Sequence, residues 1–143
     1  MRTHWFVSFL LVLGIGQVPA LACTCAQPRD PQQGLAASDA VFRGYAERFE
    51  LVTRPHVGDR KATFRVETVW KGPQRQRLEV FTAIDEGACG SDFIAGHTYL
   101  VYAKQREGAL TTSICTRTVG SRQDPIQFRN DVEALGPGTA IKK

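Results

Sequence analysis

Two cysteines that flank one threonine, Cys23 and Cys25, are the residues of this sequence best suited to do chemistry. They directly follow Ala20-Leu21-Ala22, a small-x-small triplet of the kind that signal peptidase cuts after. Cleavage after Ala22 would make Cys23 the first residue of the mature chain and give it a terminal α-amine. An amine and a carbonyl on one residue, held rigid by disulfides, can chelate a metal ion. The sequence therefore predicts that the new N-terminus is the functional end and that the rest is its scaffold.

Residues 1–22 have the composition of a secretory leader. Arg2 lies in a short polar start, and an apolar run extends from Trp5 to Gly16. This run is shorter than the roughly 20 residues that span a bilayer, and no later segment is long or apolar enough for a membrane helix. We expect residues 1–22 to be a signal peptide. Residues 23–143 then form one small domain that is secreted or periplasmic.

All four cysteines, Cys23, Cys25, Cys89 and Cys115, lie after the expected cleavage site. An even number in a small exported domain indicates two disulfides. A Cys23–Cys25 bridge would close a very tight ring, which leaves two pairings open: Cys23 with Cys89, or Cys23 with Cys115. Each bridge closes a long loop, which is worth roughly 4 kcal/mol in the chain-entropy estimate. The cysteine count alone is equally compatible with bridges that only stabilise the fold.

A short helix is expected soon after the cysteine pair. Asp30-Pro31-Gln32-Gln33 combines an N-cap aspartate, a proline at the first helical position and a glutamine three residues after the cap. The helix should run to about Ala37, although Gly34 weakens it.

A second helix is expected near the C-terminus. Asp124-Pro125-Ile126-Gln127 repeats the capping pattern, and an apolar stripe at helical spacing follows. The stripe consists of Phe128, Val132 and Leu135. We expect it to pack against the core, with Gly136-Pro137 ending the helix.

Between these helices the sequence predicts five strands, over residues 40–48, 62–71, 77–83, 98–104 and 109–118. In the clearest of them, Phe64, Val66 and Trp70 are expected to share one face. Residues 49–61 contain proline and glycine and should form a long connection or a frayed hairpin. The sequence thus predicts a mainly β fold: a five-stranded Greek-key barrel of the OB type, with a short N-terminal helix, a C-terminal helix and two disulfides.

Several other classes of function find little support in the sequence. The net charge of +4, or +3 once Arg2 is removed, comes from scattered residues and forms no stripe that could track phosphates. Ser38, Asp39, Asp92 and His97 have no catalytic spacing, so we expect neither an enzyme nor a bound cofactor. The cysteine spacing is not that of a C-x₂₋₄-C zinc knuckle. No nucleic acid is expected as a partner.

A series of motifs carries a resemblance to a known family. They are Cys23-Thr24-Cys25, Ser38-Asp39-Ala40-Val41-Phe42-Arg43, Trp70-Lys71-Gly72, Gly87-Ala88-Cys89-Gly90, Thr98-Tyr99-Leu100-Val101 and Cys115. In this order they cover most of the expected mature chain. The chain resembles the netrin-like domain, and more closely the N-terminal domain of the tissue inhibitors of metalloproteinases.

The resemblance implies an OB barrel in which Cys23 is bridged to Cys89 and Cys25 to Cys115. It also implies a monomeric inhibitor whose partner is a zinc metalloendopeptidase. The ridge that would enter the protease cleft consists of Cys23, Thr24, Cys25, Ala26, Gly87, Ala88 and Cys89. The amine and carbonyl of Cys23 would bind the zinc of the protease, and Thr24 would enter the primary specificity pocket.

This mechanism is chemically sound. A catalytic zinc keeps one position open for water, and a bidentate ligand from Cys23 would displace that water. The amine must be uncharged to bind, and an α-amine ordinarily titrates at about pH 7.7–8.0. Any residue added before Cys23 would turn the amine into an amide and abolish chelation.

The sequence departs from the animal inhibitors, which have a third bridge in this domain and a further cysteine-rich half. Ala26 and Gln27 stand where the family commonly has an apolar residue and proline. Two alternatives therefore remain. The chain could be a netrin-like binding module without inhibitory activity, or a lipoprotein acylated and membrane-anchored at Cys23. Leu21 lies two residues before Cys23, whereas the lipidation motif places leucine three before.

Overall fold

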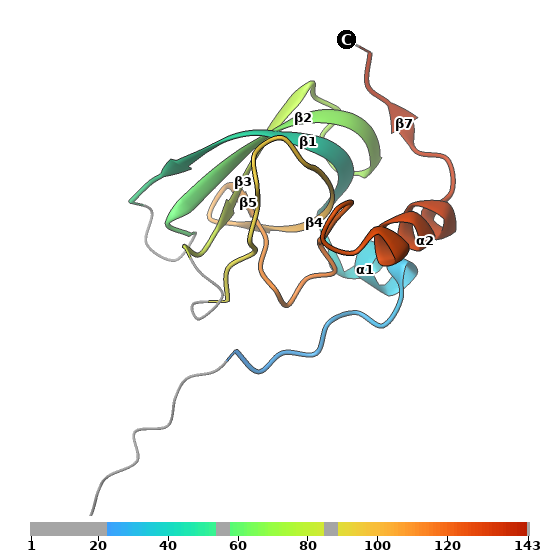
Figure 1. The fold of residues 1–143 in the computed structure, drawn as a ribbon, viewed down its shortest axis with the longest axis horizontal. Coiled ribbons are helices and arrows are strands. Elements are labelled where there is room, and N and C mark those ends of the chain that lie inside the picture. Colours follow the sequence, from blue (N-terminus) through green and yellow to red (C-terminus); the bar gives the residue numbers. More distant parts are fainter. Residues whose placement is uncertain (1–22, 54–57, 85–88, 143) are drawn as a thin grey trace, which may run out of the picture.

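A computed structural model describes residues 23–53, 58–84 and 89–142. These residues form a barrel with two helices on one side (Figure 1). The barrel strands are β1 (Ala40–Leu51), β2 (Arg60–Lys71), β3 (Arg77–Thr82), β4 (Thr98–Arg106) and β5 (Ala109–Thr111). Two further strands, β6 (Val119–Gly120) and β7 (Thr139–Ala140), have two residues each, and the helices are α1 (Pro31–Ala37) and α2 (Pro125–Leu135). In the described part of the chain, neither helix has the length and apolar character needed to cross a membrane.

The barrel closes because β1 pairs with strands on both of its sides. It runs antiparallel to β2 and to β4, and the order around the barrel is β1-β2-β3-β5-β4. The pair β3–β5 is parallel. Closure leaves these five strands without a long open edge. The expected mainly β barrel, with a helix near each end and two disulfides, is confirmed.

The barrel interior is held by aromatic rings that meet edge to face. Phe93 lies 5.1 Å from Phe64 and 4.9 Å from Tyr99 between ring centroids, and all three are at most 1% exposed. Such a pair is worth about 0.5–1.5 kcal/mol beyond the burial of its surface. The Tyr99 hydroxyl also accepts a hydrogen bond of 2.7 Å from the amide of Ile94. The loop that follows Cys89 is therefore fastened to the core.

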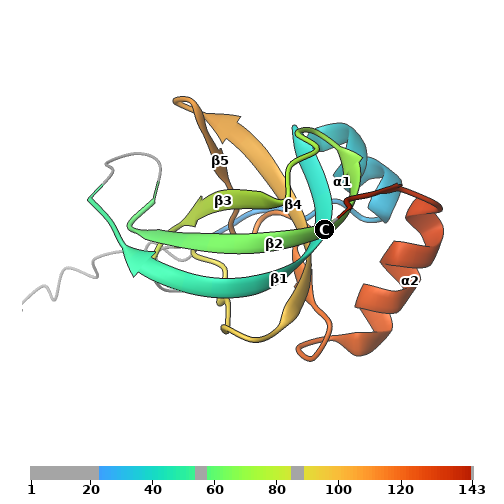
Figure 2. The same cartoon turned by 90° about the horizontal axis from the view of Figure 1, so that it is seen from above.

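A second apolar cluster lies between the barrel wall and the two helices. Figures 1 and 2 show α1 and α2 on the same side of the barrel. The buried residues of the cluster are Val41, Leu100, Tyr102 and Val119, and they pack against Leu35, Trp70, Phe128, Val132 and Leu135. The predicted stripe of α2 is thus confirmed as core packing.

Both helices begin as their capping sequences predict. The side chain of Asp30 accepts a hydrogen bond from the amide of Gln33 at 2.8 Å, and Asp124 accepts from Gln127 at 2.9 Å. Gly136 ends α2 with a φ of 69°, a conformation that glycine adopts without steric cost.

Of the two alternatives expected over residues 49–61, the structure shows the hairpin, and the ends of this range are paired strand rather than connection. Phe49 to Leu51 belong to β1, and Arg60 and Lys61 belong to β2. The hairpin is extended by side chains across the strands: Lys61 forms a 3.0 Å ion pair with Glu50, and the Arg60 guanidinium lies 4.4 Å from the Phe49 ring centre. These contacts do not depend on the apolar alternation that guided the prediction.

The prediction that Trp70 shares a face with Phe64 and Val66 was also wrong. Arg43 pairs with Thr68, whereas the next residue of β1 pairs with Val66, so β2 has one extra residue here. Such a bulge reverses the alternation of the side chains that follow. Val69 consequently enters the barrel core, and Trp70 packs in the outer cluster instead.

Candidate functional site

The N-terminal segment is bound to the barrel by two disulfides. Cys23 is bridged to Cys89 with a Cα–Cα distance of 5.7 Å, and Cys25 to Cys115 with 5.5 Å. The pairing implied by the resemblance is thus confirmed, and the crossed alternative is excluded. In Figure 1 the segment runs beneath the barrel, past the loop that follows β5, before it reaches α1.

The residues around the first bridge are accessible at the surface. Thr24, Cys25 and Ala26 are exposed, while Cys23 and Cys89 are half-buried. Cys89 has a φ of 65°, a left-handed conformation that non-glycine residues rarely adopt. Gly87 and Ala88, the other two residues predicted for this ridge, lie outside the described residues. The structure therefore brings together Cys23, Thr24, Cys25, Ala26 and Cys89.

The strand expected over residues 109–118 ends at Thr111, because the chain leaves the barrel to reach the N-terminal segment. Hydroxyl groups replace the missing strand pairing. The hydroxyls of Thr112 and Thr118 donate hydrogen bonds of 3.0 and 3.2 Å to the carbonyl of Tyr102. The amide of Tyr102 in turn donates a hydrogen bond of 2.9 Å to the Thr118 hydroxyl. The loop that carries Cys115 is fixed to β4 by these contacts.

Ile114 connects the loops on which the two bridges end. Its amide donates a hydrogen bond of 3.1 Å to the carbonyl of Cys89. Its own carbonyl accepts a hydrogen bond from the side-chain amide of Gln27. The N-terminal segment, the Cys89 loop and the Cys115 loop are therefore joined at one backbone position.

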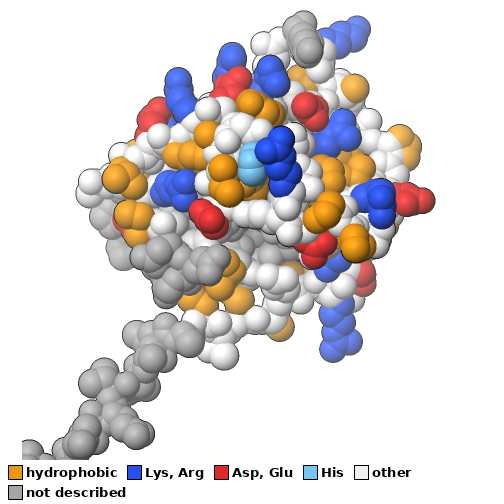
Figure 3. Space-filling view, in the orientation of Figure 1, with side chains coloured by type: hydrophobic (Ala, Val, Ile, Leu, Met, Phe, Trp, Pro, Cys, Tyr) orange, Lys and Arg blue, Asp and Glu red, His pale blue; other side chains and the backbone are white. Residues whose placement is uncertain are grey.

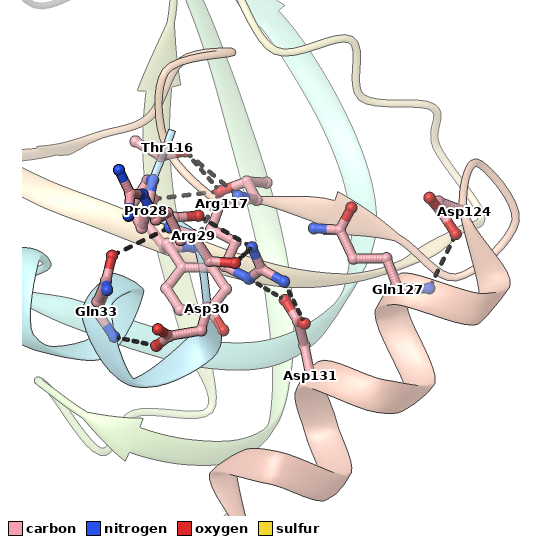
Figure 4. A network of polar contacts seen from close by, with 11 residues as sticks. Pro28, Arg29, Asp30, Gln33, Thr116, Arg117, Asp124, Gln127 and Asp131 are labelled. Atoms are coloured by element: carbon pink, nitrogen blue, oxygen red, sulfur yellow. Dashed lines mark hydrogen bonds and ion pairs between the residues drawn. The ribbon is translucent and has the colours of Figure 1, made fainter. Parts of the chain in front are cut away.

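Arg117 is the centre of a polar network that reaches α2 (Figure 4). Its guanidinium donates two parallel hydrogen bonds, of 2.7 and 2.8 Å, to the Asp131 carboxylate. It also donates to the carbonyls of Pro28 and Arg29 at 3.0 and 3.1 Å. Asp131 is 2% exposed, and its hydrogen bond raises the pKa of Arg117 above the ordinary value. Removing one partner of such a buried pair costs about 3–5 kcal/mol.

Two hollows are lined in part by the Cys115 loop. One, of about 500 Å³, has Cys89, Ser113 and Thr116 in its wall. The other, of about 350 Å³, is lined in part by Gln27 and Ile114. Residues of the Cys115 loop thus contribute to both hollows, and the N-terminal segment contributes Gln27 to the second.

The groups considered for catalysis have structural partners instead. Asp39 accepts a 2.7 Å hydrogen bond from the amide of Gln105, and Asp92 lies 3.6 Å from Arg60. His97 contacts Arg122 at 3.3 Å between nitrogen atoms. Within residues 23–53, 58–84 and 89–142, no group of three His, Cys, Asp or Glu residues is placed to hold a metal ion.

Charges of both signs alternate over the surface. Figure 3 shows lysine and arginine side chains interspersed with acidic ones on the face in view. Lys61 lies 3.0 Å from both Glu50 and Glu79, and its hydrogen bonds with them raise its pKa. Arg77 pairs with Glu47 at 2.8 Å. These pairs match the scattered charge pattern of the sequence.

Comparison with known sequences identifies the family. Residues 21–123 match the family described as tissue inhibitor of metalloproteinase. The chain belongs to this family. A relative, metalloproteinase inhibitor 3 of Xenopus laevis, is 31% identical over 112 residues, which cover 75% of this chain and 51% of the relative. The chain thus spans about half the length of that curated relative. Membership of a family of inhibitors agrees with the prediction that the chain is not an enzyme.

Two residues of the site, Arg117 and Asp131, were not identified by reasoning from the sequence. A signal for one of them exists: Asp131 interrupts the apolar face of α2, three residues after Phe128 and four before Leu135. A carboxylate at such a position is rarely buried unless it is paired. Its partner is 14 residues away in the sequence, outside the helix, and no local pattern marks it.

Proposed function

We propose that this member of the tissue inhibitor of metalloproteinase family is an exported inhibitor of a zinc metalloendopeptidase. Residues 1–22 would be removed as a signal peptide, leaving residues 23–143 as the mature, secreted or periplasmic domain. The two disulfides support export, since bridges persist in oxidising compartments. The family match supports the class of partner.

The observation that carries the mechanism is the bridge between Cys23 and Cys89 beside exposed Thr24. After cleavage, Cys23 would offer its amine and its carbonyl to the zinc of the protease. This bidentate ligand would occupy the position that the attacking water needs. Thr24 would then enter the pocket that normally holds a substrate side chain.

The bridges reduce the cost of binding. A flexible N-terminus would lose conformational freedom on entering the cleft, at roughly 1–2 kcal/mol for each backbone residue fixed. Here Cys23 and Cys25 are tied to the barrel before the protease arrives. Ala26, Gly87, Ala88 and Cys89 would complete the contact surface around them.

The decisive experiment compares two proteins that differ by one residue. One begins at Cys23, and the other has a single alanine before it. Intact mass establishes that the first is unacylated and that both gain four hydrogens on reduction, as two bridges require. We expect the first to inhibit members of a panel of zinc metalloendopeptidases, and the second, equally stable, to fail.

Three results would contradict the proposal. Equal inhibition by both proteins would reject chelation. Binding to a protease without inhibition by either protein would indicate the non-inhibitory module. A lipid-sized increment in the mass of the naturally exported protein would block the Cys23 amine and indicate a lipoprotein.

A further inference from the structure

Besides the two disulfides and the Gln27 hydrogen bond to Ile114, the N-terminal segment has an attachment at Arg117. The Arg117 guanidinium donates hydrogen bonds to the carbonyls of Pro28 and Arg29 (Figure 4). These residues follow the second bridge at Cys25 and precede the cap of α1 at Asp30. The arginine therefore holds the part of the segment that neither disulfide reaches.

The position of Arg117 in the chain makes this attachment effective. It lies two residues after Cys115, the disulfide partner of Cys25. The stretch from Ile114 to Arg117 therefore holds the N-terminal segment by a covalent bond at Cys25 and by hydrogen bonds at Gln27, Pro28 and Arg29. The bridges hold Cys23 and Cys25, and the Arg117 hydrogen bonds hold the part of the segment between Cys25 and α1.

The orientation of Arg117 is in turn set from α2. Both carboxylate oxygens of Asp131 accept from the guanidinium, at 2.7 and 2.8 Å, a bidentate geometry that fixes its plane. Asp131 is 2% exposed and is out of reach of a protease, while the Arg117 side chain is 15% exposed. Asp131 also lies beyond residue 123, where the family match ends.

We propose that Arg117, oriented by Asp131, is a positioning residue that sets the direction of the N-terminal segment and thereby the strength of inhibition. The proposal rests on the proposed function, because the segment matters only if Cys23 and Thr24 enter a protease. Asp131 acts on binding only through Arg117. A change of about 1 Å in the placement of a reacting group can cost roughly 100-fold.

The test uses Asp131→Asn and Arg117→Lys in the full mature protein. The first keeps the size of the side chain but removes the charge that orients the guanidinium. The second keeps the charge but loses the fork that reaches Pro28 and Arg29. Glu47→Gln is the matched control, because it breaks the ion pair with Arg77 on the barrel surface.

Two quantities are measured well below the melting temperature. The first is the inhibition constant against a protease that the parent inhibits, which we expect to rise roughly 10- to 100-fold in both variants. The second is ¹⁵N relaxation at Thr24 and Ala26, which should show greater motion, with the barrel strands unchanged. Glu47→Gln should change neither quantity.

The relaxation measurement separates this proposal from the one on which it rests. If adding alanine before Cys23 fails to reduce inhibition, the chelation mechanism of the proposed function is wrong, and the motion of Thr24 and Ala26 still decides whether Arg117 positions them. If the added alanine abolishes inhibition but Asp131→Asn changes neither the inhibition constant nor this motion, the positioning role is wrong. If Asp131→Asn does not fold, the same two readings on Arg117→Lys decide.

Discussion

The amide of Ile114 donates a 3.1 Å hydrogen bond to the carbonyl of Cys89, and this contact joins the two loops on which the disulfides end. The bridges from Cys23 and Cys25 therefore act on one connected frame rather than on two independent loops. The frame is itself fastened to the barrel, through Tyr99 on one side and the threonine hydroxyls on the other. Rigidity at the N-terminus thus originates in the barrel core.

Replacing both Cys23 and Cys89 with alanine tests the role of rigidity separately from the role of chemistry. The variant keeps the α-amine and the carbonyl of residue 23 but loses the first bridge. We expect inhibition to weaken strongly and the free energy of unfolding to fall by roughly 4 kcal/mol, since the bridge closes a loop of 66 residues. Urea unfolding and an inhibition assay measure the two effects. Undiminished inhibition would mean that the bridge does not preorganise the chelating residue.

Inhibition should depend on pH through the Cys23 amine. Only the uncharged amine can bind zinc, so affinity should fall as the pH drops through the range in which an α-amine ordinarily titrates, about 7.7–8.0, and reach a plateau above it. The inhibition constant is measured from about pH 6 to 9, a range that covers this titration. The activity of the protease itself is monitored in parallel. A pH-independent constant would contradict direct binding by the amine.

Two buried tyrosines should respond oppositely to loss of the hydroxyl. The Tyr102 hydroxyl has no hydrogen-bond partner among the described residues, whereas that of Tyr99 accepts from the Ile94 amide. Tyr102→Phe should therefore leave stability unchanged or raise it by up to about 1 kcal/mol, and Tyr99→Phe should cost about 1–3 kcal/mol. Equal losses from thermal unfolding of both variants would contradict the difference in bonding.

The same tyrosine predicts a loss of stability in alkali. Burial raises the pKa of Tyr102 above its ordinary value of 10.0. The unfolded chain then releases this proton more readily than the folded chain, so the free energy of unfolding decreases as the pH rises above about 10. Tyr102→Phe should reduce that decrease. The difference between the two proteins is measured by urea unfolding at several alkaline pH values.

Gly34→Ala provides a test in which helix propensity and packing oppose each other. Propensity alone would stabilise α1 by about 1 kcal/mol. A Cβ at position 34, however, would lie 2.7 Å from Cε1 of buried Tyr102, so we expect a net loss of about 1–3 kcal/mol. Ala36→Gly, at an exposed position of the same helix, should cost about 1 kcal/mol. This variant measures the effect of helix propensity without the packing effect. A stabilised Gly34→Ala variant would show that α1 is not tightly packed on β4.

The elements that could be predicted from the sequence are those whose signals are local. Asp30 and Asp124 cap their helices with residues three positions away, and the apolar spacing of α2 follows from the helix itself. The bulge in β2 could not be predicted, because it depends on how Arg43 and Thr68 pair across two strands. The same holds for the end of β5 at Thr111, after which the chain leads to Cys115 and its bridge with Cys25.

The residues of the candidate site fall into the same two groups, those with a local sequence signal and those without one. The ridge at Cys23 was recognised because its residues are adjacent in sequence and the motifs follow a family order. The support behind it was missed, because Arg117 meets its partners 14 residues later and 88 and 89 residues earlier in the chain. Contacts between residues so far apart in the sequence depend on the fold and produce no periodic pattern in the sequence.

The two bridges also impose a time order on maturation. Cys23 and Cys25 find their partners 66 and 90 residues later in the chain, so neither bridge can form while the early residues are being made. The N-terminus is consequently synthesised first but cannot reach its final order until residue 115 has been added. A chain interrupted before Cys115 would contain every residue of the N-terminal segment and would still lack its final conformation.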